Sequence, residues 1–156
     1  MNLAEVRKLY PEARPAQGHL VLEGKTAGVS TNTYFMFVDG RLAGVSVQSR
    51  ELRMSAIQYM DDYERFRRAL TQKYGTPHTD GPVWRDETFK DIPDGLSTAL
   101  TLGHAHLKTA WSTRESIVSL AAEGEKLRIS VVVTYASVRL YAILMKSINT
   151  SEADEM

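Results

Sequence analysis

The sequence predicts an α+β fold: two tandem α-β-β-β repeats form one antiparallel sheet, with helices packed on one face. Three observations lead to this prediction. An amphipathic helix pattern occurs at the start of the chain and again near residue 60. Stretches with the two-residue alternation of strands follow each pattern. The 156 residues also divide into halves of similar organisation. We therefore expect a single domain over 1–149, with pseudo-repeats of about 2–75 and 76–149.

The two helices have recognisable ends. Asn2 and Glu5 have the spacing of a capping box at the start of the first helix, and Pro11 stops it. Asp61 and Glu64 repeat that spacing, and Gly75 ends the second helix. Apolar residues recur at helical intervals in both: Leu3, Val6, Leu9 and Tyr10 in the first; Tyr59, Tyr63, Phe66, Leu70 and Tyr74 in the second.

A hairpin is expected between the helices. Asp39-Gly40 favours a two-residue turn joining Tyr34–Val38 to Arg41–Gln48. Pairing Val38 with Arg41 places two sets of apolar side chains on opposite faces: Tyr34, Met36, Val38, Ala43, Val45 and Val47 on one, Phe35, Phe37 and Leu42 on the other. The second set is either an exposed patch that anchors a partner or the face that the helices cover.

The second half predicts a three-stranded meander over Ala99–Trp111, Arg114–Glu123 and Lys126–Tyr135, with turns at Ser112-Thr113 and Gly124-Glu125. Its register places one apolar set on a single face: Ala105, Leu107, Val118, Leu120, Leu127, Ile129, Val131 and Val133. The reverse face is largely polar: His104, His106, Lys108, Glu115, Ser119, Arg128, Ser130 and Thr134. This agreement between strands predicts a sheet covered on one side.

The C-terminal part predicts a third helix over Ser137–Ile148, with an edge strand over Val138–Leu144 as the alternative. Residues 150–156 have no periodicity and contain Glu152, Asp154 and Glu155, so we expect a disordered acidic tail.

Composition excludes several classes of function. Lys+Arg and Asp+Glu both number 19, so the basic footprint of a nucleic-acid binder is missing. Without cysteine there are no disulfides, thiol nucleophiles or thiolate metal sites. No apolar run approaches the roughly 18 residues of a membrane span. The first residues do not resemble a signal peptide, so we expect the cytoplasm, or the periplasm or cell envelope if an export signal was removed.

Both helix endings lead into a turn and a meander, and Lys73-Tyr74-Gly75-Thr76-Pro77 precedes Val83-Trp84-Arg85. Over about residues 2–135, this order of elements resembles the β-lactamase-inhibitor protein family and the small bacterial outer-membrane-assembly lipoproteins. The resemblance implies a bacterial envelope scaffold whose exposed sheet face binds another protein. The inhibitor family has two helices per repeat and disulfides. Because this chain lacks both, no inhibitory residue is carried over.

His104 and His106 are the residues that most suggest a metal site, because residues i and i+2 of a strand point the same way. A third ligand would have to come from His19, His78 or a loop carboxylate such as Asp80 or Asp86. The chain has no Gly-x-Ser-x-Gly nucleophile motif and no phosphate-binding loop. We therefore expect no catalytic residue and no cofactor.

These observations predict a non-catalytic protein-binding module: a bacterial envelope assembly factor, an inhibitor or an immunity-type protein. The alternative is a small metal-binding protein or metal-dependent hydrolase centred on His104 and His106. The residues expected to contact the partner protein are Phe35, Phe37, Leu42, His104, His106 and Arg128.

Overall fold

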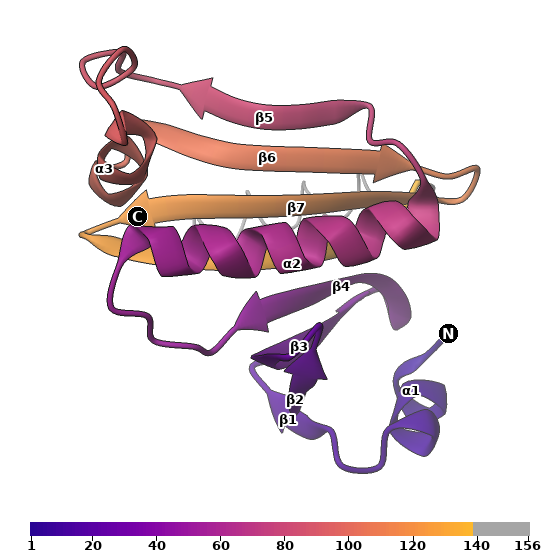
Figure 1. Cartoon of the computed structure of the whole chain (residues 1–156). Helices are drawn as coiled ribbons and strands as arrows, with labels where there is room; N and C mark the ends of the chain where they lie inside the picture. Colours follow the sequence, from indigo (N-terminus) through magenta and orange to yellow (C-terminus); the bar gives the residue numbers. More distant parts are fainter. Residues whose placement is uncertain (139–156) are drawn as a thin grey trace.

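The computed structural model describes residues 1–138, and its fold is α+β as predicted (Figure 1). Eight antiparallel strands form one open sheet, and the three helices of this part of the chain accompany it. The elements are α1 (Leu3–Leu9), β1 (Arg14–Ala16), β2 (His19–Thr26), β3 (Val29–Val38), β4 (Arg41–Ser49), α2 (Ala56–Tyr74), β5 (Thr79–Trp84), α3 (Gly95–Leu102), β6 (Ala105–Ser112), β7 (Ser116–Glu125) and β8 (Arg128–Ser137).

The sheet consists of two four-stranded meanders joined through their last strands. Its order is β1-β2-β3-β4-β8-β7-β6-β5, and β4 pairs with β8 in antiparallel orientation. Each meander follows a helix, α1 before β1 and α2 before β5. The chain therefore contains two sets of four strands, the first with helix α1 and the second with helices α2 and α3. The second set begins with α2, whereas the predicted pseudo-repeats of about 2–75 and 76–149 place that helix at the end of the first repeat. We call them the first set (residues 3–49) and the second set (residues 56–137).

Helices cover one face of the sheet, as predicted, and the core lies beneath them. Under α2, Phe66 and Leu70 pack against Trp111 and Leu120 in a cluster of fourteen buried residues. Under α1, Val6 packs against Leu20 and Phe35 in a cluster of four. Alternation along the strands places the two clusters on the same side of the sheet, because Phe35 pairs with Val45 and Val45 pairs with Tyr135.

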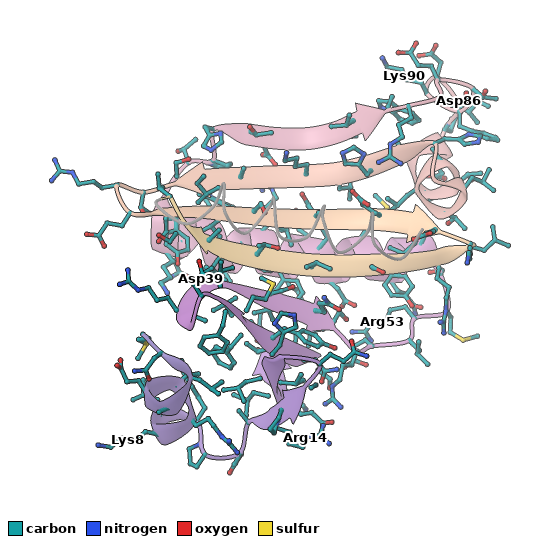
Figure 2. The ribbon with its side chains drawn as sticks, turned by 180° about the vertical axis from the view of Figure 1, so that it is seen from behind. Lys8, Arg14, Asp39, Arg53, Asp86 and Lys90 are labelled. Carbon is teal, nitrogen blue, oxygen red and sulfur yellow. The ribbon has the colours of Figure 1, made fainter. Side chains whose placement is uncertain are left out.

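The opposite face carries mostly small and polar side chains in its central strands. One cross-strand row runs through all eight strands: Thr79, Ala110, Ser119, Thr134, Ser46, Tyr34, Val21 and Arg14. Figure 2 shows the molecule from behind, with β7 and β8 in front of α2. We call this surface the open face, because none of the helices over residues 1–138 packs on it.

One helix is additional to the prediction, and one predicted helix begins earlier than expected. The expected strand beginning at Ala99 is wrong in its first part, because Gly95–Leu102 forms α3 and the strand begins at Ala105. Gly103 ends α3 with φ of 75°, a left-handed conformation that suits glycine. In α2, the capping box is Ser55 with Gln58, so the helix begins before Asp61.

The meander of the second set has the predicted faces, but both of its turns lie at other residues than predicted. Ser112 pairs with Ile117, and the β7–β8 turn is Lys126-Leu127 rather than Gly124-Glu125. Each pairing is displaced by an even number of residues, which leaves every side chain on its expected face. Leu127 is the exception in the predicted buried set, because it lies at the tip of the turn and is 71% exposed.

The hairpin of the first set turns at Asp39-Gly40 and pairs Val38 with Arg41, as predicted. A β-bulge between Met36 and Phe37 then shifts the register. Beyond it, Phe35 instead of Tyr34 shares a face with Val45, so the predicted division of the apolar residues is wrong there.

The expected helix over Ser137–Ile148, its alternative as an edge strand and the tail over 150–156 extend beyond the described residues, apart from Ser137 and Val138. Within residues 1–138, no helix is long and apolar enough to cross a membrane.

Candidate protein-binding site

A groove of about 370 Å³ lies at the end of the sheet where α2 begins. Four segments enclose it: the loop from β4 to α2, the first turn of α2, Thr101 near the end of α3, and the β7–β8 turn with the start of β8. We call it the end groove. Its lining residues are Leu52, Arg53, Met54, Ser55, Ala56, Tyr59, Thr101, Leu127, Arg128 and Ile129.

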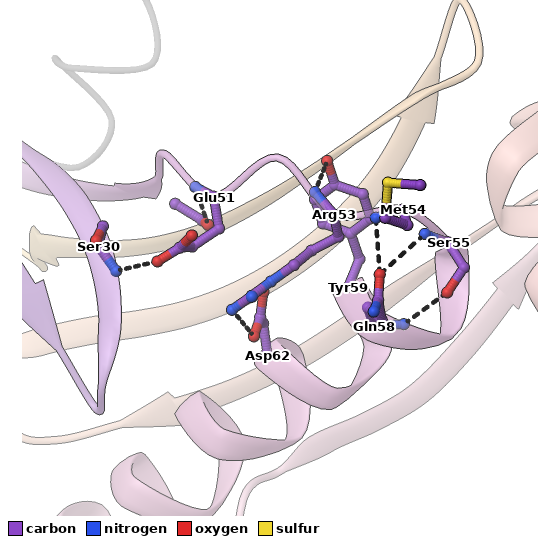
Figure 3. A network of polar contacts seen from close by, with 9 residues as sticks. Ser30, Glu51, Arg53, Met54, Ser55, Gln58, Tyr59 and Asp62 are labelled. Atoms are coloured by element: carbon purple, nitrogen blue, oxygen red, sulfur yellow. Dashed lines mark hydrogen bonds and ion pairs between the residues drawn. The ribbon is translucent and has the colours of Figure 1, made fainter.

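A buried ion pair fixes the loop that forms one wall of the end groove (Figure 3). Asp62 on α2 is only 2% exposed, and its carboxylate accepts hydrogen bonds from Arg53 Nε at 2.7 Å and Nη2 at 2.8 Å. A buried carboxylate needs such a partner, because it has lost its hydration. The hydroxyl of Tyr59 accepts the backbone N–H of Arg53 at 3.0 Å. Arg53 is therefore held at both its backbone and its side chain.

Hydrogen bonds also fix the rest of the loop in place (Figure 3). Gln58 Oε1 accepts the backbone N–H groups of Met54 at 2.7 Å and Ser55 at 3.2 Å. At the other end, the Glu51 carboxylate accepts the backbone N–H of Ser30 at 3.1 Å, and this bond lowers the pKa of Glu51. The wall of the groove is therefore preorganised by contacts to both α2 and β3.

Large apolar side chains surround this preorganised loop and face solvent. Leu52 is 80% exposed and Met54 is 94% exposed, although both belong to a loop whose backbone is fixed. Leu127, which lines the same groove, is also exposed. Single exposed apolar residues are common, but a group of them around one groove is typical of an interaction surface.

The turn that carries Leu127 has an unusual sequence. Three two-residue turns of the first set have positive φ at both positions and end in glycine: Gln17-Gly18, Ala27-Gly28 and Asp39-Gly40. In the β7–β8 turn, Lys126 and Leu127 have φ of 52° and 64°, so leucine occupies the place that glycine takes in the other three. A left-handed conformation costs a residue with a Cβ about 1–2 kcal/mol.

The charges of the end groove are one-sided. Its lining contains Arg53 and Arg128 but no carboxylate. Arg53 is neutralised by Asp62, whereas Arg128 forms no ion pair with any residue between 1 and 138. Outside the lining, Lys126 of the turn and Glu125 before it carry opposite charges. A ligand with a carboxylate beside an apolar side chain would complement this site.

Of the predicted contact residues, only Arg128 lines the end groove. Phe35 is 5% exposed beneath α1, where its ring lies 5.1 Å from that of Tyr10. Phe37 and Leu42 are half-buried against the same cluster. The expectation that Phe35 forms an exposed anchor is therefore wrong, because α1 covers this face.

The two histidines lie at the other end of β6 from Ser112. His104 precedes the strand, and its ring stacks on Phe89 with centroids 5.7 Å apart. His106 is half-buried in β6 opposite Val83. The structure gathers no group of three potential metal ligands among residues 1–138, so His19, His78, Asp80 and Asp86 do not complete a site with them.

Sequence reasoning missed most of the end groove. Leu52 and Met54 stand in a polar loop directly before a Ser-x-x-Gln capping box, and this placement is the signal that they are not core residues. Leu127 was assigned to the core because its alternation fits the buried face. Each of the three two-residue turns of the first set ends in glycine, so the sequence does not indicate that leucine can occupy the same turn position.

Compared with known protein families, curated proteins and solved structures, the chain shows no significant match.

Proposed function

We propose that this protein is a non-catalytic protein-binding module, of the kind found among bacterial envelope assembly factors, inhibitors and immunity proteins. It binds its partner through the end groove. The ligand is a segment of another protein that places an apolar side chain against Leu52, Met54 and Leu127 and a carboxylate against Arg128. The open face is a weaker candidate, because its central row consists mainly of small side chains that offer few anchors.

The observation that carries this proposal is the exposed, strained Leu127. The fold does not need leucine there, since glycine makes the same kind of turn three times in the first set. Local strain at an exposed position is a common mark of a functional site. The pairing of Glu125 with Arg128 fixes the backbone of the turn, so presenting Leu127 to a partner costs little backbone entropy.

The loop network supports the same conclusion. Arg53, Asp62 and Gln58 hold the groove wall in place without a ligand. A preformed wall reduces the free energy lost in ordering a binding site. Arg128, which forms no ion pair within residues 1–138, selects the orientation of the ligand.

The test begins with a photo-reactive amino acid at position 127, or at exposed Leu9 on α1 as the matched control. The protein cross-linked in its native cells is then identified, purified and titrated against the Leu127→Glu and Leu9→Glu variants. We expect Leu127→Glu to weaken binding by about tenfold or more, and Leu9→Glu to leave it unchanged. Equal cross-linking from both positions, or equal affinity of both variants, would contradict the proposal.

A further inference from the structure

The acidic residues at the C-terminal end are separated in sequence from most basic ones. Glu152, Asp154 and Glu155 are three of the 19 acidic residues, and no lysine or arginine follows Lys146. The preceding residues 1–149 therefore carry 19 basic and 16 acidic side chains. Met156 follows Glu155, so residues 150–156 combine carboxylates with an apolar side chain, which is the chemistry that the end groove fits.

We infer that residues 150–156 occupy the end groove of their own chain and compete there with the partner. The inference rests on the proposed function only in treating the end groove as a binding surface. Carboxylates of the segment face Arg128, and Met156 lies against the apolar side chains that line the groove. The partner therefore has to displace this segment before it binds.

Charge favours the end groove over the other end of the sheet. Arg128 has no ion pair among residues 1–138, and the groove lining has no carboxylate to repel an acidic segment. At the opposite end, Arg114 lines a pocket together with Glu115, so that lining contains a carboxylate as well as a cation. An acidic segment is attracted to the first site and gains little at the second.

The chain is long enough to reach. Strand β8 runs from Arg128 beside the groove to Ser137, which is about 30 Å at roughly 3.3 Å per residue. The twelve residues from 139 to 150 span at most about 40 Å when extended. The acidic segment can therefore return along the length of β8 to the groove without disturbing the sheet.

The absence of cysteine makes a direct test possible in the full-length protein. A nitroxide attached to Ala153→Cys broadens the NMR signals of nearby amides. We expect strong broadening at Leu52, Met54 and Leu127, which weakens as ionic strength rises from about 0.01 M to about 1 M, because the Debye length falls from about 30 to about 3 Å. Arg128→Glu removes the broadening, and so does neutralisation of the tail by E152Q, D154N and E155Q together.

Arg114→Glu is the matched control, since it reverses an arginine at the far end of the sheet and leaves the broadening in place. Mixing isotope-labelled protein with spin-labelled, unlabelled protein identifies broadening that comes from a second copy. Three results would overturn the inference: broadening centred on Arg114 or spread evenly, broadening that survives both charge variants, or broadening that arises only between molecules.

This test can fail while the proposed function stands. If the tail does not occupy the groove but Leu127→Glu still weakens partner binding, only the competition is wrong. If the tail occupies the groove and Leu127→Glu leaves the affinity for the partner unchanged, the proposed function is wrong.

Discussion

The first and second sets share one sheet but have very different cores. In the first set, α1 has seven residues and buries only Val6. In the second set, α2 has 19 residues and buries Tyr63, Phe66 and Leu70 against β6, β7 and β8. The cluster under α2 also includes Val29 and Val47 of the first set. The first set therefore depends on the second, through β4–β8 pairing and through α2.

The turns show the reverse difference, because the first set has the more favourable backbone conformations there. Glycine relieves the backbone in three turns of the first set, whereas Lys126 and Leu127 bear positive φ without it in the second. The better-buried set thus carries the less favourable turn. The comparison indicates that stability in the second set offsets strain at the end groove, a balance often found where a site serves binding rather than folding.

The largest effect is expected from deleting the central side chain of each core. Phe66→Ala leaves a cavity beneath α2 and should lower the free energy of unfolding by about 3–5 kcal/mol. Val6→Ala removes only two methyl groups beneath α1 and should cost roughly 2 kcal/mol or less. Denaturant titration measures both changes. Hydrogen exchange should show faster opening of β1–β3 than of β6–β8 in the parent protein. Equal losses in the two variants would contradict the proposed dependence of one set on the other.

A second comparison uses two strand glycines. A Cβ on Gly124 would lie 1.9 Å from the Leu100 carbonyl oxygen of α3, so Gly124→Ala must displace that helix. We expect a loss of about 1–3 kcal/mol. A Cβ on Gly24 of β2 meets no atom within 4 Å, so Gly24→Ala should be neutral or slightly stabilising. Thermal unfolding of the two variants would show whether close packing is confined to the second set.

Alkaline pH should weaken the second set through Tyr63. Burial raises the pKa of Tyr63 to about 12. Its hydroxyl lies 2.5 Å from the Thr109 hydroxyl, which donates to Asp80, so Tyr63 is the donor to Thr109. Because the folded-state pKa lies above the unfolded value of about 10, the stabilisation is complete below pH 10 and declines between about pH 10 and pH 12.

Tyr63→Phe should therefore lose less stability than the parent protein when denaturant titrations at about pH 9 and about pH 11 are compared. Tyr34→Phe removes a hydroxyl from the open face and should keep the alkaline loss of the parent. If Tyr63→Phe retains the full loss, another group causes it.

Alternation and helical spacing predicted much of this fold. An even displacement of register does not move a side chain to the other face, so the buried set around Val118, Leu120 and Val131 was correct although both turns were misplaced. In the first set, a single bulge moved Val45 and Val47 to the face of Phe35, although they were predicted to share a face with Tyr34. Bulges arise from how strands twist and pack, which the local pattern does not encode.

The end groove could not be predicted because it depends on distant segments meeting. Leu52, Thr101 and Leu127 belong to three separate loops and helix ends, and only the sheet order brings them together. The strand pattern identifies Arg128 as a contact residue because it lies on the polar side of its strand. The pattern does not show which residues surround Arg128. The strain at Leu127 is a backbone property, which hydropathy does not report.

The smallest expected effect is a gain in stability from a substitution in the β7–β8 turn. Leu127→Gly relieves the positive φ and loses little burial, so the free energy of unfolding should rise by about 1 kcal/mol. Gly18→Leu places the opposite change in a first-set turn where a Cβ meets no atom within 4 Å, and it should lower stability by about the same amount. Both values come from denaturant titration.

The same two variants distinguish folding from binding. Leu127→Gly should bind the partner more weakly although it is more stable, because the apolar side chain is gone while the turn remains. Gly18→Leu should keep its affinity although it is less stable. If Leu127→Gly proves less stable than the parent, the leucine contributes to folding, and its conformation is no longer an argument for a binding site. A stabilised variant with weakened binding would mean that the fold tolerates the strain of Leu127 while the partner requires its side chain.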